Sequence, residues 1–319
     1  MMFAAVALVL AMMNLTELNS RYGAPSRIVF HEGFAGYPNV VLANKYGTAE
    51  VALLGGNVLS YRPTGHGPVV FRPAGKDSDY NRGDKFHGGI PLCWPQFGNR
   101  FDKLLPQHGF ASKLVFEVRG TEYSEELTEV TLGLKASEET RKLWPHDFDL
   151  ELKVSVSMKL NLKVTTTNSG STPLAFSCGF HPYFRVSDPA KTFVRGLDGC
   201  KYIDASGAEL REDRQSGDFS LKGVSPDHVF FLPSAPKHEL ALMDEGLNRA
   251  IAVVAAGNER VVVWNPGTAY VVDGQAADDW KKFVCVEPVS DWPGGRTLQP
   301  GEKHELLVSI QSTLKGVAE

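Results

Sequence analysis

Hydrophobic and polar positions along most of this chain follow a period of two. Between Asp149 and Thr167 (DLELKVSVSMKLNLKVTTT) apolar and polar side chains alternate closely, which is typical of half-buried β-strands. Clusters of Gly, Pro, Asn and Asp, such as 168–173 and 293–295, separate such runs and supply turn geometry. Alternating or β-branched runs predict strands at Glu50–Tyr61, Pro68–Phe71, Leu114–Val118, Glu129–Leu134, Phe148–Met158, Lys159–Thr167, Leu174–Cys178, His228–Leu232, His238–Met243, Ala250–Ala255, Arg260–Trp264, Phe283–Glu287 and His304–Gln311.

Helical periodicity is nearly absent. Short helices are expected only at Asn14–Arg21, with Asn14 or Thr16 as the cap, and at Ala277–Lys282. Many strands without alternating helices indicate antiparallel sheets packed face to face rather than a βαβ architecture. Because the sequence has neither an internal repeat nor a long linker, we expect residues 14–319 to form a single large antiparallel β-sandwich, an all-β fold. Its concave face would be the natural ligand site.

Composition and charge narrow the classes of partner. The 319 residues are 43% hydrophobic and 22% charged, which is ordinary for a globular protein. A formal charge of −4 with scattered basic residues gives no electrostatic reason to expect nucleic acid. The four cysteines lie far apart with no CxxC pair, so we expect buried, reduced thiols rather than a disulfide framework or a zinc site: Cys93, Cys178, Cys200 and Cys285.

Residues 1–13 (MMFAAVALVLAMM) are apolar but carry no Lys or Arg, and the run is too short to span a bilayer. Two interpretations stay open. The native chain could begin at Met12 or Met13 after a misassigned start, in which case we expect a cytoplasmic monomer with no membrane partner. Alternatively the segment is a leader, and the protein is secreted or anchored.

Seven motifs carry a resemblance to a known family. Together they resemble the glucose-6-phosphate 1-epimerase branch of the aldose 1-epimerase family, in the family's order and over nearly the whole chain from about Asn14. The motifs are HGGIPLCWPQFG (His87–Gly98), QHGFA (Gln107–Ala111), WPHDFDLELKVSVS (Trp144–Ser157), HPYFRVSD (His181–Asp188), VVVWNP (Val261–Pro266), FVCVEP (Phe283–Pro288) and LQPGEKHEL (Leu298–Leu306).

The resemblance implies a galactose-mutarotase-like β-supersandwich that interconverts the α and β anomers of an aldohexose or its 6-phosphate without metal or cofactor. Opening a hemiacetal ring requires a proton to leave the anomeric hydroxyl while another reaches the ring oxygen, and two side chains of suitable pKa can do this. Carried over by motif, His181 resembles the general acid and Glu287 the general base. His108 resembles a residue that positions the sugar, and Asp227 one that binds its hydroxyls. From the residues alone, a structural role for each stays open.

Two departures from the family pattern concern a phosphate group. Phosphate-specific members usually carry Arg before Gly-Gly-Ile-Pro and after His-Gly-Phe-Ala, whereas this chain has His87 and Ser112. A phosphate dianion is bound best by fixed cations, ideally an Arg fork. Other cations could compensate, or could simply face solvent: Arg62, Arg72, Arg82, Lys85, Arg100 and Lys113. Trp94 and Gln96 are expected either to line the pocket or to pack in the core.

Three functions therefore compete. The favoured one is a hexose-6-phosphate 1-epimerase, with a mutarotase of non-phosphorylated aldoses as its alternative. A carbohydrate-binding protein without turnover is the second, and an accessory sandwich domain of a lyase or glycosidase is the third.

Overall fold

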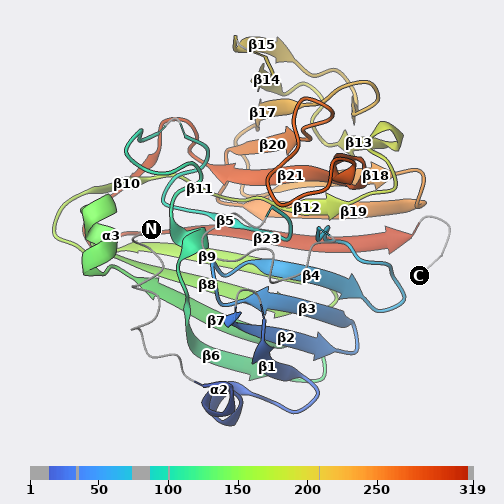
Figure 1. Cartoon of the computed structure of the whole chain (residues 1–319). Coiled ribbons are helices and arrows are strands. Elements are labelled where there is room, and N and C mark those ends of the chain that lie inside the picture. The colour runs from blue at the N-terminus through green and yellow to red at the C-terminus, as the bar shows by residue number, and fades with distance from the viewer. Residues whose placement is uncertain (1–13, 34–35, 74–86, 100, 208, 315–319) are drawn as a thin grey trace.

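A computed structural model describes residues 14–33, 36–73, 87–99, 101–207 and 209–314 (Figure 1). Antiparallel strands dominate the described chain, with short α-helices at α2 (Leu15–Tyr22) and α3 (Glu138–Leu143). None of the helices in these ranges is both long and apolar enough to cross a membrane. The apolar segment 1–13 lies outside the described residues, so its two interpretations stay predictions.

One layer of the molecule is a nine-stranded sheet that runs across the whole structure (Figure 1). In spatial order its strands are β16 (Phe219–Ser220), β13 (Thr192–Arg195), β18 (His238–Asp244), β19 (Arg249–Ala256), β23 (Lys303–Leu314), β9 (Leu160–Asn168), β8 (Phe148–Val156), β7 (Thr128–Lys135) and β6 (Glu117–Tyr123). The predicted alternation is confirmed here: along β8, Phe148, Leu150, Leu152 and Val154 are buried, and the residues between the first three of them are partly exposed.

Two further sheets lie against this layer, one over each half (Figure 1). The four-stranded sheet packs through β2 and β3 on β7 and β8. It comprises β1 (Ile28–Glu32), β2 (Pro38–Asn44), β3 (Gly47–Ala52) and β4 (Val58–Pro63). The eight-stranded sheet comprises β15 (Arg211–Arg214), β14 (Lys201–Asp204), β17 (Asp227–Phe231), β20 (Arg260–Trp264), β21 (Phe283–Ser290), β11 (Cys178–Phe180) and β5 (Leu92–Cys93), with β12 (Tyr183–Arg185) also paired to β21. A separate small ribbon pairs β10 (Leu174–Phe176) with β22 (Arg296–Leu298).

Several predicted elements differ from the structure. Of the expected strand Leu114–Val118, only Glu117 and Val118 lie in a strand, at the start of β6. The run Glu50–Tyr61 is two strands, because Gly55 and Gly56 adopt positive φ angles of 76° and 60° and turn the chain between β3 and β4. The run Pro68–Phe71 forms a single bridge, Val70 to Phe184, rather than a strand. The expected helix at Ala277–Lys282 is a 3₁₀ turn over Asp279–Lys282.

The first helix, by contrast, is confirmed. Asn14 caps α2, since its side-chain oxygen accepts a hydrogen bond from the Glu17 amide at 2.8 Å. Helix α3 was not predicted, although Ser137 and Thr140 form a reciprocal capping box at its start. Its six residues are too few for a periodic pattern to be recognised.

Strand β21 occupies the centre of the eight-stranded sheet, and all eight of its residues are buried. Val284 and Val286 point into the main core between the layers. The alternate residues Phe283, Cys285, Glu287 and Val289 therefore point to the outer face of the sheet. A carboxylic acid on the buried outer face of a central strand needs an explanation, because burying a charge is costly.

The stability of the region behind this strand depends on Trp94, which is fully buried and therefore packs in the core. Its ring meets Phe110 and Trp144 edge-on, and its Nε1 donates to Thr166 Oγ1 at 3.0 Å. We predict that Trp94→Phe lowers the free energy of unfolding by about 2–4 kcal/mol, through a cavity and an unpaired buried hydroxyl. Urea denaturation followed by circular dichroism measures the loss.

Thr166→Val is the matched partner variant. Because it removes the hydroxyl that Trp94→Phe leaves unpaired, the double variant is expected to lose roughly 1 kcal/mol less than the sum of the single losses. Strict additivity would contradict the assigned hydrogen bond.

Candidate active site

His181 and Glu287 form a cross-strand pair, although 106 positions separate them in the sequence. Cys178 pairs with Ser290 and Gly179 with Val289, and beyond the gap Tyr183 pairs with Cys285 in the same antiparallel register. That register places His181 opposite Glu287. Pro182 has no amide hydrogen to donate to β21, so the ladder between these strands is interrupted there. The His181 amide donates to the carbonyl of Pro91 at 3.0 Å, which continues the register in which β11 pairs with β5 on its other side.

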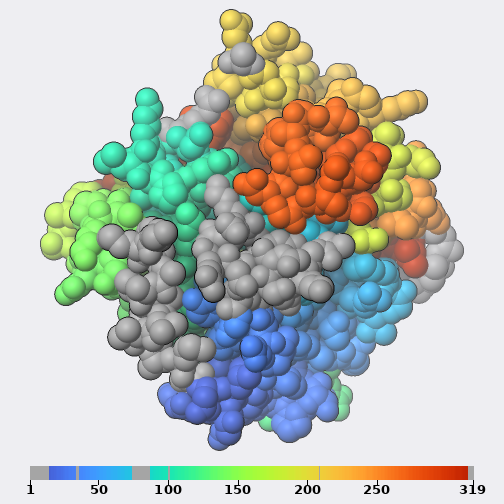
Figure 2. Space-filling model, in the orientation of Figure 1, coloured from blue at the N-terminus to red at the C-terminus, as the bar shows by residue number. Residues whose placement is uncertain are grey.

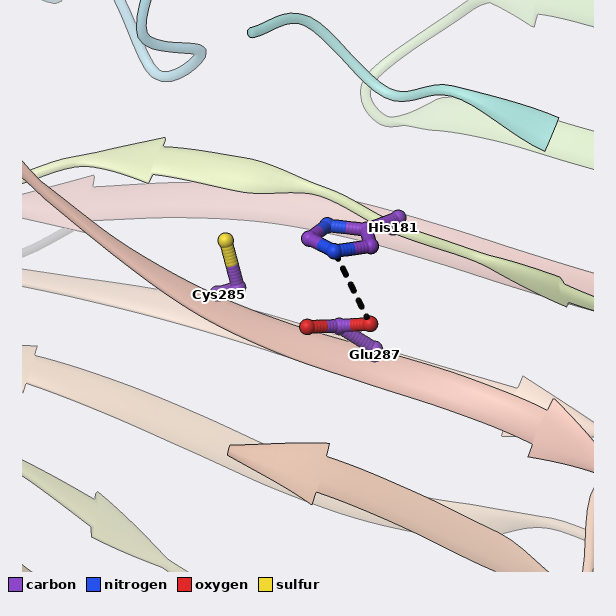
Figure 3. Close-up of side chains that lie close together, drawn as sticks. All are labelled: His181, Cys285 and Glu287. Atoms are coloured by element: carbon purple, nitrogen blue, oxygen red, sulfur yellow. Dashed lines mark ion pairs between the residues drawn. The ribbon is translucent and has the colours of Figure 1, made fainter. Parts of the chain in front are cut away.

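The two side chains meet on the outer face of the sheet (Figure 3). His181 Nε2 lies 3.4 Å from Glu287 Oε2, and the side chains are 11% and 1% exposed. Among the described residues, neither carboxylate oxygen of Glu287 nor Nδ1 of His181 has a hydrogen-bond partner. Buried polar atoms normally have partners, so these atoms are available to a ligand.

Aromatic rings enclose the imidazole. Tyr183 stacks on it, with ring centroids 4.8 Å apart and planes 14° apart, and Trp264 meets it edge-on at 5.7 Å. His108 approaches from another side at 5.4 Å, with Phe97 at 6.5 Å. Such rings offer flat apolar surfaces for the C–H face of a sugar.

Burial moves the two proton affinities in opposite directions. Desolvation raises the pKa of Glu287 well above 4.5, and the nearby charge of Asp227 raises it further. Desolvation lowers the pKa of His181 well below 6.5, and the neighbouring His108 and His87 lower it further. When the pair holds one proton, burial therefore favours the form in which the carboxyl group carries it and the imidazole is neutral. Although the spacing is that of an ion pair, we favour this neutral form for the ligand-free site, because burial is the largest cause of both shifts.

His108 reaches the site from a tight turn. It has a positive φ of 62°, and Gly109 after it has 72°. A Cβ on Gly109 would lie 2.1 Å from the Trp94 carbonyl, so only glycine fits there. The amide of Gly98 donates to His108 Nδ1 at 3.2 Å, which holds the ring beside His181. The structure thus brings His108 together with the pair.

Asp227 also belongs to this surface. It begins β17 in register with Trp264, which is in turn in register with Cys285 on β21. Its effect on the pKa of Glu287 shows that the two carboxyl groups lie within electrostatic reach.

Gln96 packs in the interior and does not line the pocket as a ligand contact would. Its side chain is fully buried, and its Nε2 donates to the carbonyls of Leu105 and Pro106 at 3.1 and 2.9 Å. Its Oε1 accepts from the Asp102 amide at 3.0 Å. Since both ends of the amide are occupied by backbone, Gln96 fixes the loop that leads to His108.

The candidate cations are distributed over several parts of the chain. Arg82, Lys85 and Arg100 lie outside the described residues. Arg62 is exposed on β4, in the four-stranded sheet rather than the sheet that carries the pair. Arg72 pairs with Glu50 at 3.2 Å, so part of its charge is already neutralised.

The two positions that depart from the family pattern are both described. The His87 ring contacts the Asp273 carbonyl through Nδ1 at 2.8 Å, and since a carbonyl only accepts, Nδ1 donates. The His87 carbonyl accepts from Gln275 Nε2 at 2.8 Å. These bonds tie His87 to the segment between β20 and β21, which forms a raised orange lobe in Figure 2. Ser112 lies in a 3₁₀ turn, partly buried.

Sequence reasoning did not identify Trp264 and Cys285 as parts of this site. A signal existed for Cys285: it precedes Glu287 by two positions, and residues two apart on a strand share a face. Within the described chain, His181, Cys285 and Glu287 are the one group of three or more His, Cys, Asp or Glu side chains close enough to hold a metal ion. The site thus offers a proton donor and acceptor in contact, between aromatic walls.

Known proteins resemble this chain over most of its length. The model of the aldose 1-epimerase family matches residues 38–311. A protein of Escherichia coli K12 named "Putative glucose-6-phosphate 1-epimerase" is 34% identical over 241 residues, which cover 75% of this chain and 78% of that protein. A protein of the same name from Cenchrus ciliaris is 30% identical over 276 residues, covering 83% and 81%.

Solved structures share the fold. The crystal structure of a "putative mutarotase" from Salmonella typhimurium superposes with a TM-score of 0.83 at 28% identity, over 92% of this chain and 96% of that one. A galactose mutarotase-like protein from Clostridium acetobutylicum gives a TM-score of 0.72 at 18% identity, over 90% and 98%. The all-β sandwich expected from the sequence is therefore confirmed, and the chain belongs to the aldose 1-epimerase family.

Proposed function

We propose that the protein is an isomerase that interconverts the α and β anomers of a hexose 6-phosphate by acid–base ring opening. The observation that carries the proposal is the contact between His181 Nε2 and Glu287 Oε2, 3.4 Å apart and almost fully buried. A pair that holds one proton can both give and take a proton in a single turnover.

The proton movements balance over one turnover. Glu287 takes the proton of the anomeric hydroxyl while protonated His181 gives one to the ring oxygen, and the C1–O5 bond breaks to leave an open-chain aldehyde. Rotation about the C1–C2 bond presents the other face of the aldehyde. The two groups then reverse their roles, O5 attacks C1, and the ring closes as the other anomer.

The burial of the two side chains favours this order of proton transfers. After ring opening His181 is neutral and Glu287 carries the proton, which is the distribution that burial stabilises through the opposite pKa shifts of the two groups. Before ring opening the pair is charged, and the anomeric hydroxyl can stabilise the carboxylate by donating a hydrogen bond. The burial of the pair would thus stabilise the open-chain intermediate.

The surrounding residues would hold the sugar. We assign His108 to hydrogen bonds with the substrate's oxygens, because its ring borders that of His181 at 5.4 Å. Asp227 is assigned to the hydroxyls, which would donate to its carboxylate. Tyr183 and Trp264 flank the imidazole and would contact the ring's C–H groups.

Different observations favour a substrate with a phosphate group and a substrate without one. The names of the relatives favour a hexose 6-phosphate. The alternative, a mutarotase of non-phosphorylated aldoses, is favoured by His87 and Ser112 in place of the arginines and by the pairing of Arg72 with Glu50. A single experiment on substrate preference separates the two.

Replacement of either member of the pair tests the mechanism. His181→Ala and Glu287→Gln are each expected to lower the catalysed rate of anomer exchange by about 10²–10⁴-fold, because each removes one of the two proton-transfer groups. Exchange is measured by NMR saturation transfer between the anomeric protons. Full activity in both variants would contradict the assignment.

Stability provides the control for these variants. The raised pKa of Glu287 means that the folded state binds more protons than the unfolded state above pH 4.5, so the carboxyl group destabilises the fold increasingly as pH rises. Glu287→Gln removes that cost, and we expect it to be more stable than the wild type at pH 8 by about 1–2 kcal/mol. A loss of activity together with a gain in stability excludes misfolding as the cause.

The pH dependence of kcat/KM reports the same two groups. Because burial lowers the pKa of His181 and raises that of Glu287, activity is expected to fall on an acid limb that lies well below pH 6.5, where His181 takes up a second proton, and on an alkaline limb that lies well above pH 4.5, where Glu287 loses its proton. His108→Gln removes a charge that lowers the pKa of His181, so its acid limb should lie at higher pH than that of the wild type. An unchanged or lower acid limb would contradict the coupling.

Substrate preference is tested with glucose, galactose and glucose 6-phosphate. We expect the gain in exchange rate over the spontaneous rate to be largest for glucose 6-phosphate. Equal gains with and without the phosphate would favour the aldose alternative. Binding of sugar with no gain for any substrate would identify a carbohydrate-binding protein instead.

A further inference from the structure

Cys285 adds a third donor to the His181–Glu287 pair. It lies on the same face of β21 as Glu287, and its thiol rises from that face to one side of the imidazole (Figure 3). One ligand atom from each of the three residues lies within 4.8 Å of the other two. An imidazole nitrogen, a thiol and a carboxylate thus converge on one small volume.

The described protein offers the carboxyl group of Glu287 no hydrogen bond. Glu287 is 1% exposed, and neither of its oxygens has a hydrogen-bond partner in the described chain. Apolar and aromatic residues surround the group, among them Phe71, Tyr183 and Phe283, which pack with Cys285 in one cluster. A buried carboxylate without hydrogen bonds provides a strong reason for a cation to bind.

We propose that His181, Cys285 and Glu287 form a binding site for a thiophilic divalent cation, Zn²⁺ or Cd²⁺, and that the bound cation inhibits the protein. The donor set selects for this class of ion. Soft thiolate and imidazole ligands favour zinc and its heavier congener, whereas Mg²⁺ and Ca²⁺ require oxygen ligands. Three protein ligands also leave one tetrahedral position for water or a sugar hydroxyl.

Charge and protons balance on binding. The thiol and the carboxyl group each release a proton to solvent, the imidazole binds through a lone pair, and the divalent cation neutralises the two resulting negative charges. The filled site is electrically neutral, as a dry apolar surrounding requires.

The spacing is close to that of a filled site. With metal–ligand bonds of about 2.0–2.3 Å, donors of a tetrahedral zinc ion lie about 3.3–3.8 Å apart. His181 Nε2 and Glu287 Oε2 already have that separation, at 3.4 Å. The widest gap, up to 4.8 Å, closes through small side-chain rotations, and the longer bonds of Cd²⁺ need less movement. For this reason Cd²⁺ is the better probe.

Inhibition rests on the proposed function, but cation binding does not. A cation on Nε2 and the carboxylate occupies both atoms that would exchange protons with the sugar. Sugar and cation would therefore compete for the same site. The two claims can be measured separately, because a cadmium–thiolate bond has its own ultraviolet charge-transfer absorption.

The experiment titrates the full-length, reduced protein with Cd²⁺ alone and follows this absorption. We expect one equivalent to bind, and Cys285→Ser to weaken binding by about 100-fold, since it removes the soft ligand. His181→Ala is expected to weaken binding as well, which keeps the test valid if Cys285→Ser fails to fold. Near-ultraviolet circular dichroism establishes folding for each variant.

Cys200→Ser is the matched control. Cys200 is the most exposed of the four cysteines, at 7%, and lies outside the group. The Cys200→Ser variant should bind Cd²⁺ with the affinity of the wild type. No charge-transfer band, a band that persists in Cys285→Ser, or one that disappears in Cys200→Ser would each overturn the proposal. If the band behaves as expected but the protein has no epimerase activity, the cation site stands and the proposed function fails.

Discussion

The burial of one imidazole and one carboxyl group in direct contact is the constraint around which this structure is organised. His181 and Glu287 lie 3.4 Å apart with almost no exposure, and such a pair is costly unless it shares a proton. Burial raises the pKa of one group and lowers that of the other, so the pair is neutral when it holds one proton. This gives the protein a proton donor and acceptor within a dry site, and the fold must supply enough stability elsewhere to maintain it.

The layered sheets supply that stability through the period of two along each strand. One face of β21 contributes Val284 and Val286 to the main core, while the other face presents Cys285 and Glu287. A single central strand therefore both anchors the sandwich and presents the buried carboxyl group of the candidate site. His181 lies opposite Glu287 in the register of β11 and β12 with β21, and the Pro91 carbonyl holds its amide from the other side, in the register of β11 with β5.

Residues that do not touch a sugar still determine the geometry of the site. Gln96 holds the loop before His108 by three backbone hydrogen bonds, and Gly109 allows the chain to pass the Trp94 carbonyl closely enough for His108 to border His181. The same close packing places the Cys285 thiol near the pair. The proposed proton-exchange pair and the proposed cation site therefore share the same two side chains.

The sequence by itself determined the local structure and the chemistry available to it. Period-two alternation predicted strands such as β8, because a half-buried strand must alternate its faces, and a β-branched run predicted β20. The sequence did not predict β1, β2 or β13. The motifs around His181 and Glu287 indicated the family. Only the tertiary structure decided that the two residues meet, because the register between β11–β12 and β21 depends on contacts more than 100 positions apart. It also decided that the Gln96 side chain bonds to the backbone of a loop. Likewise only the tertiary structure brings the thiol of Cys285 near the imidazole of His181, because side-chain packing between strands has no local signature in the chain.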